Sequence, residues 1–534
     1  MRKRKIIIFL IFLSILSLCR PKAVCKYVEG VYPHVANKSY DKRACWISYI
    51  DIQTYLCDKS ETALRAKINA MFQNICNNQL NTVIIHVRAM GDACYPSEYF
   101  PYSVSISSDR SDLGYDPFQI MVDTAHLWGL KVEAWINPYR LSLNEETTMQ
   151  FRQSEYYEQY KNMILEYTGE NGTCLALDPG NAETRALIIR QVEEIMTHYD
   201  VDGIHMDDYF YVDGMQPDLS QAEKKENVNL LIRDLYKTIK DINPDCEFGI
   251  SPAGNPDYAR SQGADIDTWL SDSGYVDYIM PQIYWTDHYI VGENTVSMFT
   301  DRCKMWQSIN KNQTPMYVGL ALYRVGELSD TDLDWSQYQD NLARQCEIAY
   351  ENGYFGFSLF RYAYLEAASA KEELDHLNAY ITKRYGNVNA DTDAYITYTS
   401  HIQTYGWQGA KTDGVVSGMT RSGKRLEAIR VQLGSLAEKG GVTYRTYVNE
   451  DGWQSWVQNG EQSGTTGQSK YVEALEMRLM GACEEMYHIY YRIYSVDSGW
   501  SEWKKNGETA GTPGQSGKTS AFQVKLIPKK ILAN

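Results

Sequence analysis

Two adjacent aspartates, Asp207 and Asp208, are the residues of this chain whose type and spacing best suit catalysis. They end the segment DGIHMDD (202–208), which we expect to form a buried strand. Side chains alternate between the two faces of a strand, so His205 and Asp207 should both point into the fold. Neighbouring carboxylates repel each other, and one of them keeps its proton to a higher pH. One acid and one anion near neutral pH is the division of roles that glycoside hydrolysis needs.

Structural roles compete with this interpretation. The Asp-Gly pair at 202–203 suits a turn that enters the strand, and we assign it that role. Asp207 or Asp208 could instead cap a helix or form a salt bridge. Catalysis remains the favoured interpretation for at least one of these two aspartates.

The elements that must position the two aspartates follow a regular order. From about residue 43 to residue 385, short apolar segments alternate with amphipathic helical stretches. An open doubly wound sheet is the alternative to a closed barrel, but no glycine-rich phosphate loop follows any expected strand. The pattern predicts an α/β fold, a (β/α)8 TIM barrel over residues 40–385. The expected strands are Ala44–Ile50, Thr82–Arg88, Leu130–Asn137, Gly203–Asp207, Glu247–Pro252, Val276–Tyr284, Met316–Leu322 and Tyr354–Phe360.

Polar and aromatic residues recur where these strands end. The carboxyl ends of barrel strands form the one face on which active sites occur, so we expect these side chains to meet there. Inward-facing barrel histidines such as His86 and His205 are more often hydrogen-bonded than metal-bound, so we expect no metal and no cofactor. The catalytic candidates are Asp207, Asp208 and Asp92, and the substrate-binding candidates are Arg88, Asn137, Tyr139, His205, Gln282, Tyr284, Trp285 and Arg361.

A repeated pattern occupies the C-terminal part of the chain, after an expected linker at 386–394. Gly406-Trp407, Gly452-Trp453 and Gly499-Trp500 are spaced 46 and 47 residues apart and share later glycine positions. Each unit is too small to bury a core alone, so three should pack together as one all-β domain over 395–530, a prism or a trefoil. The repeats span about 395–434, 441–481 and 488–528. We expect the three Gly-Trp tryptophans to be core residues, and Trp456 and Trp503 to be binding candidates.

The barrel segment resembles the bacterial glycosyl-hydrolase-like family 10. The matching stretches include RACWISYID (43–51), EAWINPYR (133–140), VDGIHMDDYFY (201–211) and VDYIMPQIYW (276–285). The resemblance implies hydrolysis of a glycan, with members tied to peptidoglycan strands that lack peptide stems. The repeats resemble clostridial hydrophobic repeats with a conserved tryptophan, which implies surface attachment or recognition.

Two catalytic assignments follow from related barrels. The Asp-Asp pair is similar to that of O-GlcNAcase-type hexosaminidases, in which Asp207 would orient the substrate's acetamido group and Asp208 would be the general acid. In the α-amylase-type arrangement Asp207 would be the nucleophile, and Asp92 or Glu98 would be the separate acid. Both assignments stay open at this stage.

The N-terminus predicts export. Residues 2–5 are basic and residues 6–18 are apolar, which suits a signal peptide over 1–25, although a retained anchor is the alternative. Lipidation at Cys19 would require a variant lipobox. The net charge of −16 excludes nucleic acid as a partner. The eleven cysteines are scattered without zinc-site spacing.

The sequence therefore predicts a secreted or cell-surface glycoside hydrolase. Its expected partner is a polysaccharide that contains N-acetylhexosamine, above all the glycan strands of peptidoglycan, and the repeats would target it to the surface or to the glycan. The alternative is a non-catalytic surface protein that binds glycans on a barrel scaffold.

Overall fold

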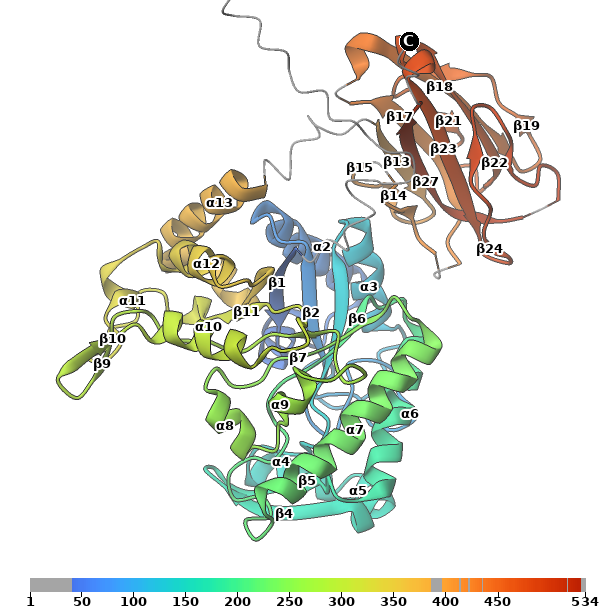
Figure 1. Cartoon of the computed structure of the whole chain (residues 1–534). Coiled ribbons are helices and arrows are strands. Elements are labelled where there is room, and N and C mark those ends of the chain that lie inside the picture. The colour runs from blue at the N-terminus through green and yellow to red at the C-terminus, as the bar shows by residue number, and fades with distance from the viewer. Residues whose placement is uncertain are drawn as a thin grey trace, which may run out of the picture.

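The computed structural model describes residues 41–385, 396–412, 414–420, 423–434, 436–515 and 517–529. They form a barrel and a smaller β domain (Figure 1). The expected signal peptide at 1–25, Cys19 and the expected linker at 386–394 lie outside the described residues. Within the described ranges, no helix combines the length and the apolar character needed to cross a membrane. The cysteines in these ranges are all free thiols.

Eight parallel strands form the barrel, in the order β11-β12-β1-β2-β3-β6-β7-β8. Parallel bridges from Ile279 to Met316 and from Gln282 to Gly319 join the two end strands, so the sheet closes on itself. The predicted (β/α)8 fold is confirmed, with each expected strand in place. The strands are β1 (Lys42–Ile47), β2 (Thr82–Arg88), β3 (Lys131–Ile136), β6 (Gly203–Met206), β7 (Glu247–Ile250), β8 (Tyr278–Ile279), β11 (Val318–Leu320) and β12 (Gly356–Leu359).

Polar caps set where the covering helices begin. The Ser220 hydroxyl accepts a hydrogen bond from the Glu223 amide, and the Glu223 carboxylate accepts hydrogen bonds from the Ser220 amide and hydroxyl, so α7 begins at Gln221. The main helices are α1 (Tyr49–Leu56), α2 (Glu61–Asn77), α3 (Pro117–Leu127), α6 (Ala182–His198), α7 (Gln221–Ile242), α10 (Met298–Ile309), α12 (Asn341–Glu351) and α13 (Lys371–Tyr385). Between β3 and α6, the short helices α4 (Glu145–Arg152) and α5 (Glu155–Tyr160) precede the hairpin of β4 (Ile164–Gly169) and β5 (Gly172–Leu177).

The barrel interior holds a layer of large side chains that includes Trp46, Trp135, Tyr278 and Tyr317. A Cβ at Gly249 would lie 1.9 Å from Cζ of Tyr278, so only glycine leaves room for that ring. Beside this layer runs a buried polar chain, in which Lys42 pairs with Glu133 and the Tyr278 hydroxyl contacts both Glu133 and Nδ1 of His205. Aromatic and charged side chains therefore fill the barrel interior below the mouth.

The predicted binding role of His205 is corrected by this packing. Its ring is fully buried, its Nδ1 lies 2.7 Å from the Tyr278 hydroxyl, and its Nε2 accepts a hydrogen bond from Trp46 Nε1 at 3.3 Å. Both ring nitrogens are occupied inside the barrel, so His205 supports the site from below and does not contact substrate.

The β domain consists of three five-stranded sheets that exchange strands between repeats. β17 (Leu426–Leu433) of the first repeat pairs with β21 (Ser463–Gly464) of the second. β22 (Val472–Gly481) of the second pairs with β26 (Ala510–Gly511) of the third. β16 (Ser417–Gly418) of the first pairs with β27 (Thr519–Pro528) of the third. The long remaining strands are β13 (Ile396–Ile402), β18 (Gly440–Val448) and β23 (Tyr487–Ser495). The three-repeat all-β domain is confirmed, and no repeat completes its sheet alone.

The Gly-Trp tryptophans are not core residues, contrary to the expectation from sequence. The core of the β domain consists of side chains from the long strands, such as Ile429, Leu475 and Val524. The indoles are partly exposed, and Arg430, Arg445 and Arg492 lie 4.1, 4.5 and 4.4 Å from the ring centroids of Trp407, Trp453 and Trp500. Each arginine thus covers one indole on the surface of its sheet.

Trp456 and Trp503 are stacked in the same way. Arg445 and Arg478 each lie 4.8 Å from the Trp456 ring, while Arg492 and Lys525 lie 4.7 and 3.8 Å from the Trp503 ring. Both rings stay partly exposed beside these cations, and their role in sugar binding stays a prediction.

The first repeat joins the β domain to the barrel (Figure 1). The Tyr405 hydroxyl contacts Arg65 Nη1 of α2 at 2.7 Å and Asp123 Oδ2 of α3 at 3.3 Å. Lys411 Nζ donates to the His126 carbonyl at 3.3 Å, and burial lowers the pKa of this lysine to about 8. Thr420 donates to Asp200, which precedes β6. The β domain therefore docks at the end of the barrel opposite to Asp207.

Strand exchange predicts that the β domain folds only as a set of three repeats. Removing residues 485–534 takes away β27, the partner of β16, and β26, the partner of β22. We expect calorimetry of the shortened chain to show the barrel transition and no cooperative β-domain transition. A protease-resistant, cooperatively unfolding fragment made of the first two repeats would contradict this expectation.

Candidate active site

Strand β6 delivers Asp207 and Asp208 to the mouth of the barrel. β6 lies between β3 and β7, with Met206 level with Ile136 of β3 and Ile250 of β7. The chain leaves the sheet at Asp207, where the carboxyl ends of the strands converge. The two aspartates are therefore placed where the sequence predicted them.

Asp207 is held by donors from β3 and from its own turn. Trp135 Nε1 donates to Oδ2 at 3.2 Å, Asn137 Nδ2 donates to Oδ1 at 3.2 Å, and the Tyr209 amide donates to Oδ1 at 3.3 Å. The residue is only 4 % exposed, and burial raises its pKa to about 6, while the charge of Arg140 acts in the opposite direction. Three donors that favour the charged form orient an anion at this position.

Asp208 has fewer partners and is half-buried. Gln282 Nε2 donates to its Oδ1 at 3.4 Å and to the Ser251 carbonyl at 2.9 Å. Burial and, second, the neighbouring charge of Asp207 raise the pKa of Asp208 to about 7. Asp208 is therefore the member of the pair that keeps its proton to the higher pH, which is the property of a general acid.

Trp135 is itself fixed from both sides. Its ring stacks on His86 with centroids 3.6 Å apart and an interplanar angle of 9°, and it meets His205 edge to face. Burial lowers the pKa of both histidines well below the usual value, so both rings are neutral. The indole N–H aimed at Asp207 is thus positioned by packing and not by charge.

Aromatic residues surround the carboxylates at the strand ends. Tyr284 contacts Tyr323 edge to face at 5.8 Å, and both pack against Phe360. Tyr209 and Tyr323 are 41 % and 39 % exposed, so these rings present apolar faces to solvent at the mouth. Such rings suit the apolar faces of pyranose sugars.

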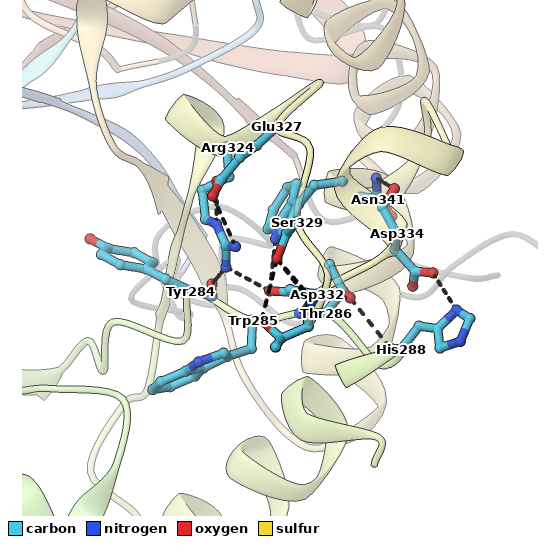
Figure 2. Close-up of polar contacts among 12 residues, drawn as sticks. Tyr284, Trp285, Thr286, His288, Arg324, Glu327, Ser329, Asp332, Asp334 and Asn341 are labelled. Carbon is cyan, nitrogen blue, oxygen red and sulfur yellow. Dashed lines mark hydrogen bonds and ion pairs between the residues drawn. The ribbon is translucent and has the colours of Figure 1, made fainter. Parts of the chain in front are cut away.

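A buried aspartate fixes the loop that carries Tyr284 and Trp285 (Figure 2). Asp332 is fully buried, accepts hydrogen bonds from the Thr286 amide and hydroxyl, and pairs with Arg324 at 2.6 Å. The same Arg324 nitrogen donates to the Tyr284 carbonyl at 2.8 Å. This hub ties the loop after β8 to the loop after β11 and holds the aromatic side of the mouth in place.

Several predicted residues do lie at this site. Asn137 and Gln282 contact the two aspartates directly, and Tyr284 and Trp285 belong to the aromatic side. Arg361, at the end of β12, forms an ion pair with the buried Asp51. Its position is as expected, although its charge is already compensated.

Asp92, Arg88 and Tyr139 are buried next to the site, and their predicted roles stay predictions. Asp92 is 2 % exposed, and its nearest cation is Arg110 at 4.0 Å. Arg88 is fully buried, donates to the Asn137 carbonyl and has its pKa lowered by burial to about 10. Tyr139 is 1 % exposed. Arg88 therefore supports Asn137 from within the barrel.

Trp135 and Arg140 lie at the site but are not among the candidates selected from the sequence. Both belong to the segment EAWINPYR (133–140). Strand alternation places Trp135 and Asn137 on the same face, and this signal could have identified Trp135. No group of His, Cys, Asp or Glu side chains suited to a metal ion occurs among the described residues.

Comparison with known proteins identifies the family. Residues 41–217 and 214–337 match the model of the family described as Glycosyl hydrolase-like 10, so the chain belongs to this family. Residues 401–434, 447–481 and 496–528 match the Clostridial hydrophobic W repeat.

Two relatives have names that state a hydrolase. Glycosyl hydrolase YngK of Bacillus subtilis is 29 % identical over 371 residues, which cover 61 % of this chain and 70 % of YngK. Glycosyl hydrolase DigH of Escherichia coli K12 is 33 % identical over 296 residues, which cover 48 % of this chain and 65 % of DigH. The C-terminal domain of a chitinase from Desulfitobacterium hafniense, at 10 % identity, 64 % coverage of this chain, 99 % coverage of that domain and a TM-score of 0.41, says nothing about activity.

The raised pKa of Asp208 predicts a pH-dependent gain in stability when its charge is removed. An unfolded aspartate has a pKa of about 3.9. The stabilisation of the folded state by protonated Asp208 is complete below that value and is lost as the pH rises through about 7. Asp208→Asn should therefore raise the Tm of the barrel at pH 8 by roughly 2 °C or more, and less at pH 5.

A matched control is the exposed Asp218. Asp218→Asn should leave the Tm within error of wild type at both pH values. Equal Tm values for wild type and Asp208→Asn at pH 8 would show that Asp208 is ionised without cost in the folded protein.

Proposed function

We propose that the protein is an exported glycoside hydrolase that cleaves glycans containing N-acetylhexosamine, with the glycan strands of peptidoglycan as substrate. Membership of the Glycosyl hydrolase-like 10 family and the names of its relatives support a glycosidase. The single observation that carries the proposal is the unequal aspartate pair at the end of β6, in which three donors hold Asp207 while the half-buried Asp208 has one amide partner and the more strongly raised pKa.

The two environments assign two roles. Asp208 gives its proton to the glycosidic oxygen as the bond to the leaving sugar breaks. Asp207, anionic and held by Trp135 and Asn137, accepts a hydrogen bond from the N–H of the substrate's acetamido group and orients its carbonyl oxygen. That oxygen attacks the anomeric carbon to form a cyclic intermediate. Water then opens the intermediate while Asp208, now ionised, takes a proton from the attacking water.

The competing assignment of Asp207 as nucleophile needs a separate acid. Asp92 is buried beside Arg88 and Arg110, and the Glu98 amide is tied to Glu194 at 2.6 Å in the outer loop. Neither carboxylate contacts Asp207 or Asp208 in the described part of the chain. This arrangement favours Asp208 as the acid.

The repeats have a separate task in this proposal. They hold the enzyme at the cell surface, where its substrate is found, after export directed by residues 1–25. Docking of the first repeat at the far end of the barrel supports this arrangement, since the mouth is left uncovered.

The direct test is hydrolysis of peptidoglycan strands from which an amidase has removed the peptide stems. We expect the wild type to release new reducing ends. Asp208→Asn should lower kcat by roughly 10²- to 10⁴-fold, because the variant lacks the proton donor. Asp218→Asn, on the exposed loop before α7, is the matched control and should keep full turnover.

Two results would count against the proposal. Strands that bind to the wild type without being cleaved would favour a glycan-binding protein. Full turnover by Asp208→Asn would remove this residue as the acid.

A further inference from the structure

A hollow lies beside the third repeat of the β domain, between β24 (Gly499–Trp500) and the start of β22. Its volume is about 200 Å³. Pockets for drug-sized ligands measure about 300–1,000 Å³, so this hollow suits a smaller unit, of the size of one sugar residue. The polar side chains that line it include Ser495, Ser498, Ser501, Thr512, Glu473 and Lys504.

Small residues keep the hollow open in the third repeat. In the second repeat, Asp451 and Lys470 form an ion pair across the equivalent place. Their counterparts 47 residues later are Ser498 and Gly517, which are too short to meet. The strand pairing is otherwise the same in the two repeats, since Val448 faces Val472 as Ser495 faces Thr519. The hollow therefore results from the side chains and not from a different backbone.

Glu473 brings a buried carboxylate to this hollow. It is 2 % exposed, and its two oxygens accept one hydrogen bond each, from Asn449 Nδ2 at 3.1 Å and from the Gly514 amide at 2.6 Å. The equivalent carboxylate of the first repeat, Glu427, pairs with Arg425 at 2.8 Å. Glu473 forms no ion pair with any residue in the described ranges. A buried carboxylate is costly without a cation, and about half of its lone-pair sites are still available to a ligand.

The charges that line the hollow favour a cationic ligand. Its lysine, Lys504, lies 3.8 Å from Glu502, a second carboxylate of the lining, and does not pair with Glu473. The lining thus carries two carboxylates and one ammonium group. The excess negative charge attracts a positive group, while the serine and threonine hydroxyls can exchange hydrogen bonds with the hydroxyls of a sugar.

We propose that the hollow binds one amino sugar residue of a wall glycan, through an ammonium group that donates to Glu473. The ring hydroxyls of the sugar contact Ser495, Ser498 and Thr512. A hexosamine carries a free ammonium group once its acetamido group has lost the acetyl group, whereas the N-acetylated residue offers only a neutral amide. The third repeat therefore selects de-N-acetylated parts of the glycan. This inference rests on the attachment role that the proposed function gives to the repeats, and it does not depend on hydrolysis.

Two tetrasaccharides test the ligand. The chitosan tetramer consists of glucosamine and the chitin tetramer of N-acetylglucosamine, so the two probes differ only in their acetyl groups. The parent protein is the whole chain with Asp208→Asn, which the proposed mechanism leaves unable to cleave either probe. Each probe is titrated calorimetrically into it in mildly acidic buffer, in which the glucosamine amines carry their protons. Because the barrel also binds hexosamine chains in the proposed function, the contribution of the hollow is the affinity that is lost when it is closed.

Ser498→Asp combined with Gly517→Lys closes the hollow with the ion pair of the second repeat. The two changes leave the net charge unaltered, and a Cβ at Gly517 would meet only the Thr512 hydroxyl, at 3.2 Å. We expect this closed variant to bind the chitosan tetramer roughly tenfold or more weaker than the parent, and the chitin tetramer equally well. Equal affinity of parent and closed variant for the chitosan tetramer would overturn the inference, and so would an equal loss on both probes.

Glu473→Gln removes the charge that the ammonium group meets. Its loss of affinity for the chitosan tetramer should match that of the closed variant. Glu485→Gln makes the same change of charge on the exposed side of α14 (Ala482–Met486) and should bind as the parent does. Thermal unfolding of both variants checks that the β domain is intact. An intact Glu473→Gln protein with the affinity of the parent would contradict the role of this carboxylate.

Failure of the proposed function has a different signature. If the wild type releases no reducing ends from bare strands but the hollow binds the chitosan tetramer, the hydrolase proposal fails and this inference stands. If the wild type cleaves the strands and closing the hollow changes no affinity, this inference alone is refuted.

Discussion

Burial of two adjacent carboxylates at the end of β6 is the constraint on which the site depends. Taking Asp207 and Asp208 out of water raises the pKa of both, and their mutual repulsion adds to the effect on Asp208. Such a pair is costly unless its environment compensates one of the charges. Trp135 and Asn137 compensate Asp207, while Asp208 receives only a distant amide from Gln282. This unequal support turns two identical residues into an anion and an acid.

The rest of the barrel maintains that inequality. Trp135 can direct its N–H at Asp207 because His86 stacks under its ring and His205 meets its edge. His205 is in turn fixed by Tyr278 and Trp46 in the closed interior. On the opposite side of the mouth, Asp332 and Arg324 hold the loop that carries Tyr284. The chemistry at the mouth therefore depends on buried contacts one and two layers below it.

Sequence patterns were sufficient for the architecture and for the position of Asp207 and Asp208 at a strand end. Strand alternation and the order of apolar segments located all eight barrel strands and placed Asp207 at a strand end. The same reasoning failed where polarity was taken as a sign of exposure. Arg88, Tyr139 and His205 follow or lie within strands, but their side chains are buried by neighbours that are distant in the sequence.

The repeats show a similar limit of prediction from sequence. Periodicity predicted three units that pack together, but not the exchange of strands among them, since pairing partners are 34 or more residues apart. Trp456 and Trp503 were selected for their aromatic character, and their cover of arginine and lysine comes from neighbouring strands. Long-range packing decided the exposure of each ring, and no local pattern encodes it.

The unequal titration of Asp207 and Asp208 is the central claim, and carbon-13 NMR of aspartate carboxyls tests it most directly. Titration of the intact protein should show one carboxyl with a pKa near 7 that is absent in Asp208→Asn. In Asp207→Asn the same signal should titrate at a lower pH, because the neighbouring negative charge is gone. If no signal assigned to Asp208 titrates above pH 5, Asp208 is ionised at neutral pH and this account of the site is wrong.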